Sequence, residues 1–224
     1  MNIVLLCNRS KPEVNQVAEI IASYGNVVTI SDAAPDVEFL SQFDLGVSYF
    51  YRHILKPEHI KAVRMGLVNC HISLLPRGRG ADPAVWSIVN KFPAGVTMHW
   101  IDAGVDTGPI IAQMETNKFD TDTCETLYKR LSQDMLDLFK MTWPVLEKFR
   151  FTTNLRSQGR DGWMNHRKID TVVLDDLETR YGKFNAREFV DILRARTFPG
   201  KPSAYITDSD GKKIYVRVTL EKEL

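Results

Sequence analysis

Apolar positions along the first 150 residues follow strand and helix patterns in alternation. Residues 3–7 form a continuous apolar run, which is typical of a strand buried on both faces of a parallel sheet. The next apolar positions keep helical spacing as far as Gly25: Val14, Val17, Ile20 and Ile21. A second strand is predicted over residues 26–30. Strand, helix and strand within about thirty residues indicate a βαβ unit.

The same alternation continues beyond this unit. Strands are predicted over residues 45–49, 67–71, 95–101 and 109–115, and helices over 35–43, 57–64, 83–89 and 121–148. Pro144 is expected to kink or break the last of these helices, because proline removes a backbone donor. The pattern predicts an α/β fold over residues 1–150: a Rossmann-like open, mostly parallel sheet flanked by helices.

Residues 151–224 predict a smaller unit, made of a linker, a helix and a C-terminal β-hairpin. Residues 157–162 show little periodicity and are predicted to be a linker or an exposed loop. Asn185 with Glu188 is typical of a capped helix start, as is Ser10 with Glu13 earlier in the chain. Residues 204–207 and 213–220 predict the two strands of the hairpin.

Composition and charge narrow the class of protein. The chain has 29 basic and 28 acidic residues, a net charge of +1, which argues against a nucleic-acid-binding surface. Its three cysteines are widely spaced, so neither a disulfide framework nor a metal site is expected. The N-terminal apolar run is too short for a signal peptide or a membrane span. We therefore expect a cytoplasmic protein with no membrane partner.

Asn69 and His71 carry the first candidate chemistry. In a strand, residues two apart project from the same face, so the amide and the imidazole are expected to enter one cleft at the strand's carboxyl end. They are either a satisfied polar pair or an oxyanion-stabilising amide beside an acid or base histidine.

Two glycine-containing loops add charged groups. Asp106 lies in a loop with two glycines and could reach back toward His71, although such a loop is also compatible with a plain turn. Arg77 and Arg79 alternate with glycines; they form either a solvated basic loop or a pair suited to phosphate contacts.

Four segments occur in a specific order: Asn69-x-His71-x-Ser73-Leu74-Leu75-Pro76, Gly80-x-x-Pro83, Gly95-Val96-Thr97-x-His99 and Asp102-x-Gly104-Val105-Asp106-Thr107-Gly108-Pro109-Ile110. Together they resemble the core of the formyltransferase family that uses N10-formyltetrahydrofolate. The resemblance implies that Asn69, His71 and Asp106 are catalytic. Asn69 would donate a hydrogen bond to the oxyanion formed when an amine attacks the formyl carbon. His71 would stabilise that charge and pass protons, while Asp106 would orient His71 and help to deprotonate the amine.

The resemblance also implies a place for the cofactor N10-formyltetrahydrofolate. Its pteridine would lie against two segments, largely through backbone contacts in the first: Arg52, His53, Ile54 and Leu55, and Asp102, Ala103, Gly104 and Val105.

Residues 74–86 and 194–200 are most similar to sugar N-formyltransferases, which act on nucleotide-linked amino sugars destined for bacterial surface polysaccharide. A sugar nucleotide substrate is therefore expected, and a dTDP-linked amino-dideoxy sugar above all. The residues expected to hold it are Arg9, Arg77, Arg79, Trp86 and His99. Formylation of methionyl-tRNA or glycinamide ribonucleotide stays open, as does a non-catalytic folate- or nucleotide-binding module. A homodimer is expected, since Ile214, Val216 and Val218 would otherwise form an exposed apolar edge.

Overall fold

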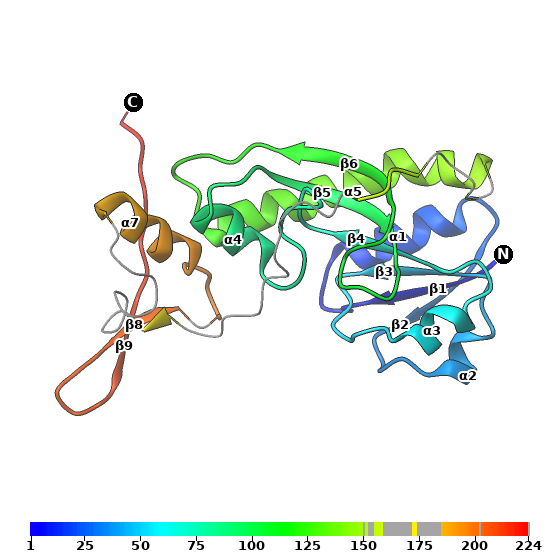
Figure 1. Ribbon diagram of the computed structural model, residues 1–224, viewed down its shortest axis with the longest axis horizontal. Coiled ribbons are helices and arrows are strands. Elements are labelled where there is room, and N and C mark those ends of the chain that lie inside the picture. Colours follow the sequence, from blue (N-terminus) through cyan, green and yellow to red (C-terminus); the bar gives the residue numbers. More distant parts are fainter. Residues whose placement is uncertain (150, 152–154, 159–171, 174–184, 202, 224) are drawn as a thin grey trace.

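A computed structural model of the protein describes residues 1–149, 151, 155–158, 172–173, 185–201 and 203–223. Over these residues the main sheet has six strands in the order β2-β1-β3-β4-β5-β6 (Figure 1). The strands are β1 (Asn2–Cys7), β2 (Val27–Ser31), β3 (Leu45–Tyr49), β4 (Leu67–His71), β5 (Ala94–Trp100) and β6 (Ile110–Thr116). The first four in sequence run parallel, and β5 runs antiparallel to both of its neighbours. The predicted Rossmann-like, mostly parallel sheet is confirmed.

Helices cover both faces of this sheet: α1 (Glu13–Ala22), α2 (Val37–Leu40), α3 (Pro57–Ala62), α4 (Pro83–Val89) and α5 (Cys124–Lys148). Successive residues of β1 alternate between two cores. Ile3 and Leu5 pack in the cluster that includes α1 and α5, whereas Val4 and Leu6 pack in the cluster around α2 and α3. Because all four side chains are at most 1% exposed, β1 is buried on both faces, as its unbroken apolar run predicts.

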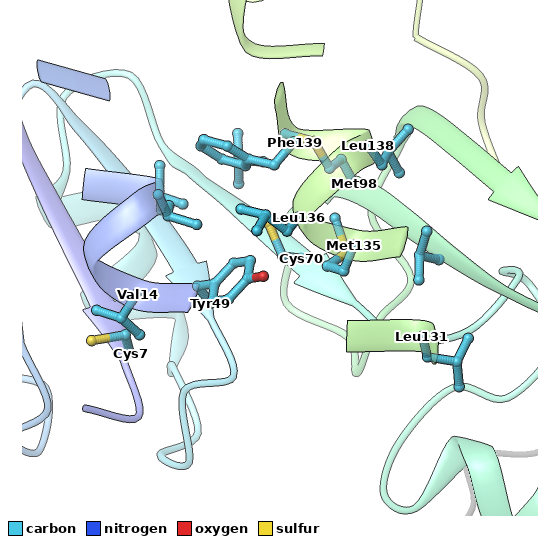
Figure 2. Close-up of a cluster of buried hydrophobic side chains, with 14 of the residues drawn as sticks. Cys7, Val14, Tyr49, Cys70, Met98, Leu131, Met135, Leu136, Leu138 and Phe139 are labelled. Atoms are coloured by element: carbon cyan, nitrogen blue, oxygen red, sulfur yellow. The ribbon is translucent and has the colours of Figure 1, made fainter. Parts of the chain in front are cut away.

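The larger core lies between the sheet and α5. Figure 2 shows Tyr49, Cys70 and Met98, which come from three adjacent strands, beside Leu136 and Phe139 of α5. Apolar side chains at helical spacing let α5 cover the strands β4, β5 and β6.

The pairing of β4 with β5 determines where the polar side chains lie. Val68 and Cys70 of β4 belong to the α5 core, so Asn69 and His71 project from the opposite face of the sheet. The antiparallel register sets Asn69 directly across from His99 of β5. An amide and an imidazole from two strands are therefore neighbours on one face of the sheet.

A smaller C-terminal unit lies beside α4, at the end of the molecule away from α2 and α3 (Figure 1). It contains α7 (Ala186–Ala195), β8 (Ala204–Thr207) and β9 (Lys213–Val216), which confirms the predicted helix and hairpin. The capping box of Asn185 and Glu188 is also confirmed. Sequence patterns did not predict β7 (Val172–Val173), which pairs in parallel with β8 and gives a three-stranded sheet.

Three local predictions were wrong in whole or in part. The Ser10 hydroxyl donates to Asn8 Oδ1 instead of capping a helix, and α1 begins after Pro12. The break expected at Pro144 does not occur: α5 continues through this residue to Lys148, anchored on both sides of the proline by the fully buried Trp143 and Leu146. The alternative expectation, a kink, stays a prediction.

The third wrong prediction concerns the hairpin edge. Val216 and Val218 pack against the buried cluster of Ile192, Leu193 and Ala204, whereas Ile214 stays 48% exposed. Only one of the three predicted edge residues is therefore open to solvent.

Among the described residues, no helix combines the length and the apolar composition needed to cross a bilayer.

Candidate active site

Asn69, His71 and Asp106 meet on one face of the sheet, near the carboxyl end of β4. Asn69 Nδ2 donates to Asp106 Oδ1 at 3.3 Å, and His71 Nδ1 lies 3.7 Å from Asp106 Oδ2. His71 Nε2 lies 2.9 Å from the carbonyl oxygen of Gly78. That oxygen can only accept, so Nε2 carries a proton and Nδ1 is the ring atom that faces the carboxylate. The three side chains form one cluster although Asp106 is remote from the other two in sequence.

His99 completes this cluster from the adjacent strand. Its Nδ1 lies 2.8 Å from the carbonyl oxygen of Trp100, and its Nε2 lies 3.1 Å from Asn69 Nδ2. The carbonyl accepts from Nδ1–H, which leaves the lone pair of Nε2 in the neutral ring to accept from the Asn69 amide. His99 is only 1% exposed, so it is shielded from solvent. Its contact with Nδ2 orients the Asn69 amide.

Asp106 is held as a carboxylate. Burial would raise the pKa of Asp106, but the neighbouring imidazole of His71 and the hydrogen bond from the Gly80 N–H hold this pKa well below its usual range. The Gly80 N–H donates to Asp106 Oδ2 at 2.9 Å. Asp106 also has a φ of 53°, a left-handed conformation that costs about 1 to 3 kcal/mol in a residue other than glycine.

The loop that carries Asp106 is constrained by Gly108. A Cβ at Gly108 would lie 1.8 Å from the carbonyl oxygen of Trp100, so this position admits only glycine. The close approach of the two backbones brings the loop against the end of β5, where Asp106 reaches Asn69.

Sequence patterns missed Gln158, which lies in the stretch predicted to be a linker or an exposed loop; residues 159–162 of that stretch lie outside the described residues. Its Nε2 donates to the carbonyl oxygens of Asp106 at 3.0 Å and Gly108 at 2.7 Å. Its Oε1 accepts from Arg79 Nη2 at 2.7 Å. Gln158 therefore connects the Asp106 loop to the arginine loop. No periodicity signal could have identified it, because it acts as a single polar side chain in an irregular segment.

The two segments expected to contact the cofactor begin or end at or next to residues that pack against the same face of the sheet. Leu55 and Ile101, at the bases of these segments, pack against one cluster that includes Leu67. Ile54 is 81% exposed and Val105 is 48% exposed, so each segment presents a large apolar side chain to solvent. Arg52, His53, Asp102, Ala103 and Gly104 are likewise exposed.

A cavity of about 660 Å³ is lined by residues of α4 and α5 and by residues that follow β1, β3 and β4. Its lining includes Ile72, which directly follows His71, and Asp82 at the start of α4. Its basic lining residues are Lys11, Arg52, Arg196 and Lys201, and its aromatic ones are Phe50, Tyr128 and Phe198.

The five residues expected to hold the sugar nucleotide lie outside this cavity. Arg9 pairs with Asp32 at 3.2 Å, Arg79 binds Gln158, and His99 contacts Asn69 and Asp106. Arg77 and Trp86 are half-buried. None of these five described residues lines the 660 Å³ cavity.

Neither thiol nor metal chemistry is indicated near this cavity. Cys124 lines it, but burial raises the pKa of this thiol to about 12, so it stays protonated and is a poor nucleophile at neutral pH. Within the described part of the chain, no group of three or more histidine, cysteine or carboxylate side chains is arranged to hold a metal ion.

Comparisons with known proteins identify the class of enzyme that this fold and cluster define. The family model for formyl transferase matches residues 16–139, which is more than half of the chain. The chain therefore belongs to the formyl transferase family and is a formyltransferase. A second model, the N-formyltransferase dimerization C-terminal domain, matches residues 176–222.

Several individual proteins are similar to this chain in sequence or in structure. The chain is 33% identical over 187 residues to a dTDP-4-amino-4,6-dideoxyglucose formyltransferase of Mycobacterium bovis, covering 83% of this chain and 77% of the relative. It is similar to the structure of the formyltransferase PseJ from Anoxybacillus kamchatkensis, solved with UDP-4,6-dideoxy-4-formamido-L-AltNAc and tetrahydrofolate. That match has 34% identity and a TM-score of 0.65, covering 81% of this chain and 89% of PseJ. A sugar N-formyltransferase from a Shewanella species has the same fold, with a TM-score of 0.77 at 24% identity over 100% of this chain and 99% of that one.

Proposed function

We propose that the protein transfers the formyl group of N10-formyltetrahydrofolate to the primary amine of a nucleotide-linked amino sugar, such as a dTDP-amino-dideoxy sugar for surface polysaccharide synthesis. One observation carries this proposal: Asn69, His71 and Asp106 form one cluster, and Ile72, the residue after His71, lines a basic cavity. The Mycobacterium and Anoxybacillus relatives, whose names specify dTDP- and UDP-linked sugars, support it.

The three clustered side chains suit acyl transfer to an amine. Asn69 is the hydrogen-bond donor for negative charge on the formyl oxygen, a role whose loss typically costs about 10² to 10³ in turnover. Asp106 is an ionised acceptor for the proton that the amine loses, and it faces Nδ1 of His71 at 3.7 Å, which lets His71 take part in the proton transfer. His99 is a positioning residue that acts through Asn69.

Both hydrogens of the Asn69 amide have acceptors: His99 Nε2 at 3.1 Å and Asp106 Oδ1 at 3.3 Å. The longer bond, to Asp106, is the one that gives way when Asn69 turns a hydrogen to the formyl oxygen. The shorter bond to His99 keeps the amide plane in place during that change.

The two cofactor segments fit a folate. A pteridine is a flat ring system with polar edges, and Ile54 and Val105 offer the exposed apolar surface that such a ring covers. Backbone groups of residues 52–55 and 102–105 are the donors and acceptors for its edges. When bound, the folate supplies the activated formyl group.

The cavity fits the other substrate. Four basic side chains and one acidic side chain line about 660 Å³, a volume within the usual range of small-molecule sites. A sugar nucleotide has an anionic diphosphate for these cations and planar and ring portions for the aromatic walls. The expected residues Arg9, Arg77, Arg79 and Trp86 stay predictions for parts of the substrate that extend beyond this cavity.

We further propose a cytoplasmic homodimer that joins through the C-terminal unit. The family model of the dimerization domain matches this unit, and Ile206 and Ile214, which pair across the hairpin on one face, are 39% and 48% exposed. These side chains are the apolar surface that a second copy would cover.

The test is an assay of the purified protein with N10-formyltetrahydrofolate and a panel of dTDP-, UDP- and GDP-linked amino sugars. Charged methionyl-tRNA and glycinamide ribonucleotide are the comparison substrates. Formylation of an amino sugar supports the proposal. Turnover on methionyl-tRNA or glycinamide ribonucleotide with none on any sugar would reverse the assignment, and folate binding without any turnover would identify a binding module.

A further inference from the structure

The C-terminal unit forms one wall of the substrate cavity. Residues Arg196, Phe198, Gly200 and Lys201 line it together with residues that follow β1 and β3, namely Asn8, Lys11 and Arg52. Two parts of the chain nearly two hundred residues apart thus enclose one space. The cavity is incomplete without residues 196–201.

This wall is held in place by a buried ionic anchor. Arg194 is 4% exposed and pairs with Asp191 at 2.7 Å. It also donates to the carbonyl oxygen of Asp122 at 2.8 Å, just ahead of α5. The backbone N–H of Glu125 donates to the carbonyl oxygen of Thr197 at 3.3 Å. These bonds join the end of α7 to the start of α5, so residues 196–201 belong to the same packed body as the catalytic sheet.

An aromatic contact between α5 and the C-terminal unit lies in the cavity wall. The rings of Phe198 and Tyr128 lie 5.6 Å apart, edge to face. The ammonium group of Lys11 lies 4.3 Å from the Tyr128 ring centre and 4.9 Å from that of Phe50. The aromatic groups therefore keep Lys11 pointing along the wall that Phe198 helps to build.

Positive charge is concentrated in this space. Besides Lys11, the lining includes Arg52, Arg196 and Lys201, against the single carboxylate of Asp82. Burial lowers the pKa of Lys11 most; Glu13 opposes this change, while the positive charges of Lys201 and Arg52 add to it. The positive charges of Lys201 and Arg52 therefore act on Lys11. In the described part of the chain, neither Arg52 nor Lys201 forms an ion pair, so their charge remains available to a ligand.

We infer that residues 196–201 are part of the substrate site, and that Lys201, with Lys11 and Arg52, binds the diphosphate of the sugar nucleotide. This inference rests on the proposed function. A diphosphate is the part of that substrate whose charge matches several converging cations, and lysine binds phosphate as a compact point charge. Since the dimerization model spans residues 176–222, one segment serves both assembly and substrate recognition.

Lys201 provides the cleanest test because its side chain is exposed and outside the Arg194 anchor. The variants are Lys201→Glu, Lys201→Ala and Lys201→Arg. The matched control is Lys212→Glu, an exposed lysine of the same C-terminal unit, in the β8–β9 turn and outside the cavity. The measurements are kcat and KM for both substrates, together with inhibition by dTDP and by inorganic pyrophosphate.

Lys201→Glu is expected to raise the KM of the sugar nucleotide about tenfold or more, because a repulsive charge replaces a charge-assisted contact. The KM of the formyl donor and kcat should stay within about twofold, since the lysine does not touch the reacting atoms. Inhibition by pyrophosphate should weaken in parallel. Lys201→Ala should give an intermediate change, and Lys201→Arg should restore most of the affinity.

An unchanged sugar-nucleotide KM in Lys201→Glu, or an equal change in Lys212→Glu, would overturn the inference while leaving the formyltransferase assignment intact. If the wild-type protein formylated no amino sugar, the proposed function would fail instead. Calorimetric titration of pyrophosphate and dTDP would then still decide the inference, since equal affinity in wild type and Lys201→Glu would exclude a diphosphate site at this wall.

Discussion

Two amide substitutions of His99 separate the two hydrogen bonds that this side chain makes. The amide group of asparagine occupies the place of Nδ1, so His99→Asn keeps a donor for the Trp100 carbonyl but removes the acceptor for Asn69. The longer glutamine side chain reaches the place of Nε2, so His99→Gln keeps an acceptor for Asn69 and loses the bond to Trp100. The two variants therefore form a matched pair.

The size of each effect follows from burial. His99 is 1% exposed, so a group that loses its partner there stays without water, at a cost of about 1 to 3 kcal/mol. Both variants should lower the free energy of unfolding by an amount in this range. Only His99→Asn removes the hydrogen bond that His99 accepts from the Asn69 amide. If the same energy is lost in the transition state, kcat falls about 5- to 160-fold in His99→Asn, whereas His99→Gln stays within about fivefold of the wild type.

The assay combines urea unfolding with steady-state kinetics of formyl transfer. The account predicts similar losses of stability, a selective loss of kcat in His99→Asn, and little change in either KM. Equal kcat values in the two variants would refute the claim that His99 positions Asn69. A rise in sugar-nucleotide KM in both variants would assign His99 to substrate binding instead.

Three further outcomes follow from the site. His71→Asn should lower turnover by about 10² to 10⁴ while a folate titration shows nearly unchanged binding; a parallel loss of binding would indicate a structural role. Gly108→Ala should destabilise the fold by more than about 3 kcal/mol in urea unfolding, because its Cβ would meet a backbone oxygen at 1.8 Å. Gly25→Ala, which has nothing within 4 Å but a φ of +78°, should cost only about 1 kcal/mol, and equal costs would contradict this reasoning. The depressed pKa of Asp106 means that its carboxylate stabilises the folded state above its usual pKa of about 4, and that this contribution is lost as the pH falls below that value. The stability difference between wild type and Asp106→Asn should therefore shrink from pH 7 to pH 3, and a difference that grows would contradict the assigned sign.

The strand patterns were predictable because burial on both faces leaves an unbroken apolar run, as in residues 3–7. The pairing of Asn69 with His71 was predictable too, since a period of two defines one face of a strand. Helix starts were less certain. The signal at Asn185 was sufficient, whereas that at Ser10 was overridden when its hydroxyl bonded to Asn8.

The rest of the site depends on tertiary contacts that leave no local pattern. His99 lies across from Asn69 only because of the register between β4 and β5. Gln158 contributes through its amide alone, in a segment without periodicity. Lys201 reaches the cavity because the buried Arg194 fastens α7 to the start of α5. Residue types and spacing can mark such residues as candidates, but they do not give the strand register or the packing of α7 that brings them together.

The most direct test of the account is mass spectrometry of a dTDP-linked 4-amino-4,6-dideoxy sugar after incubation with the protein and N10-formyltetrahydrofolate. The account predicts a product heavier by one CO group in the wild-type reaction, and almost none with Asp106→Asn at equal protein concentration. A formylated product formed equally well by Asp106→Asn would contradict the central claim that Asn69, His71 and Asp106 together catalyse the transfer.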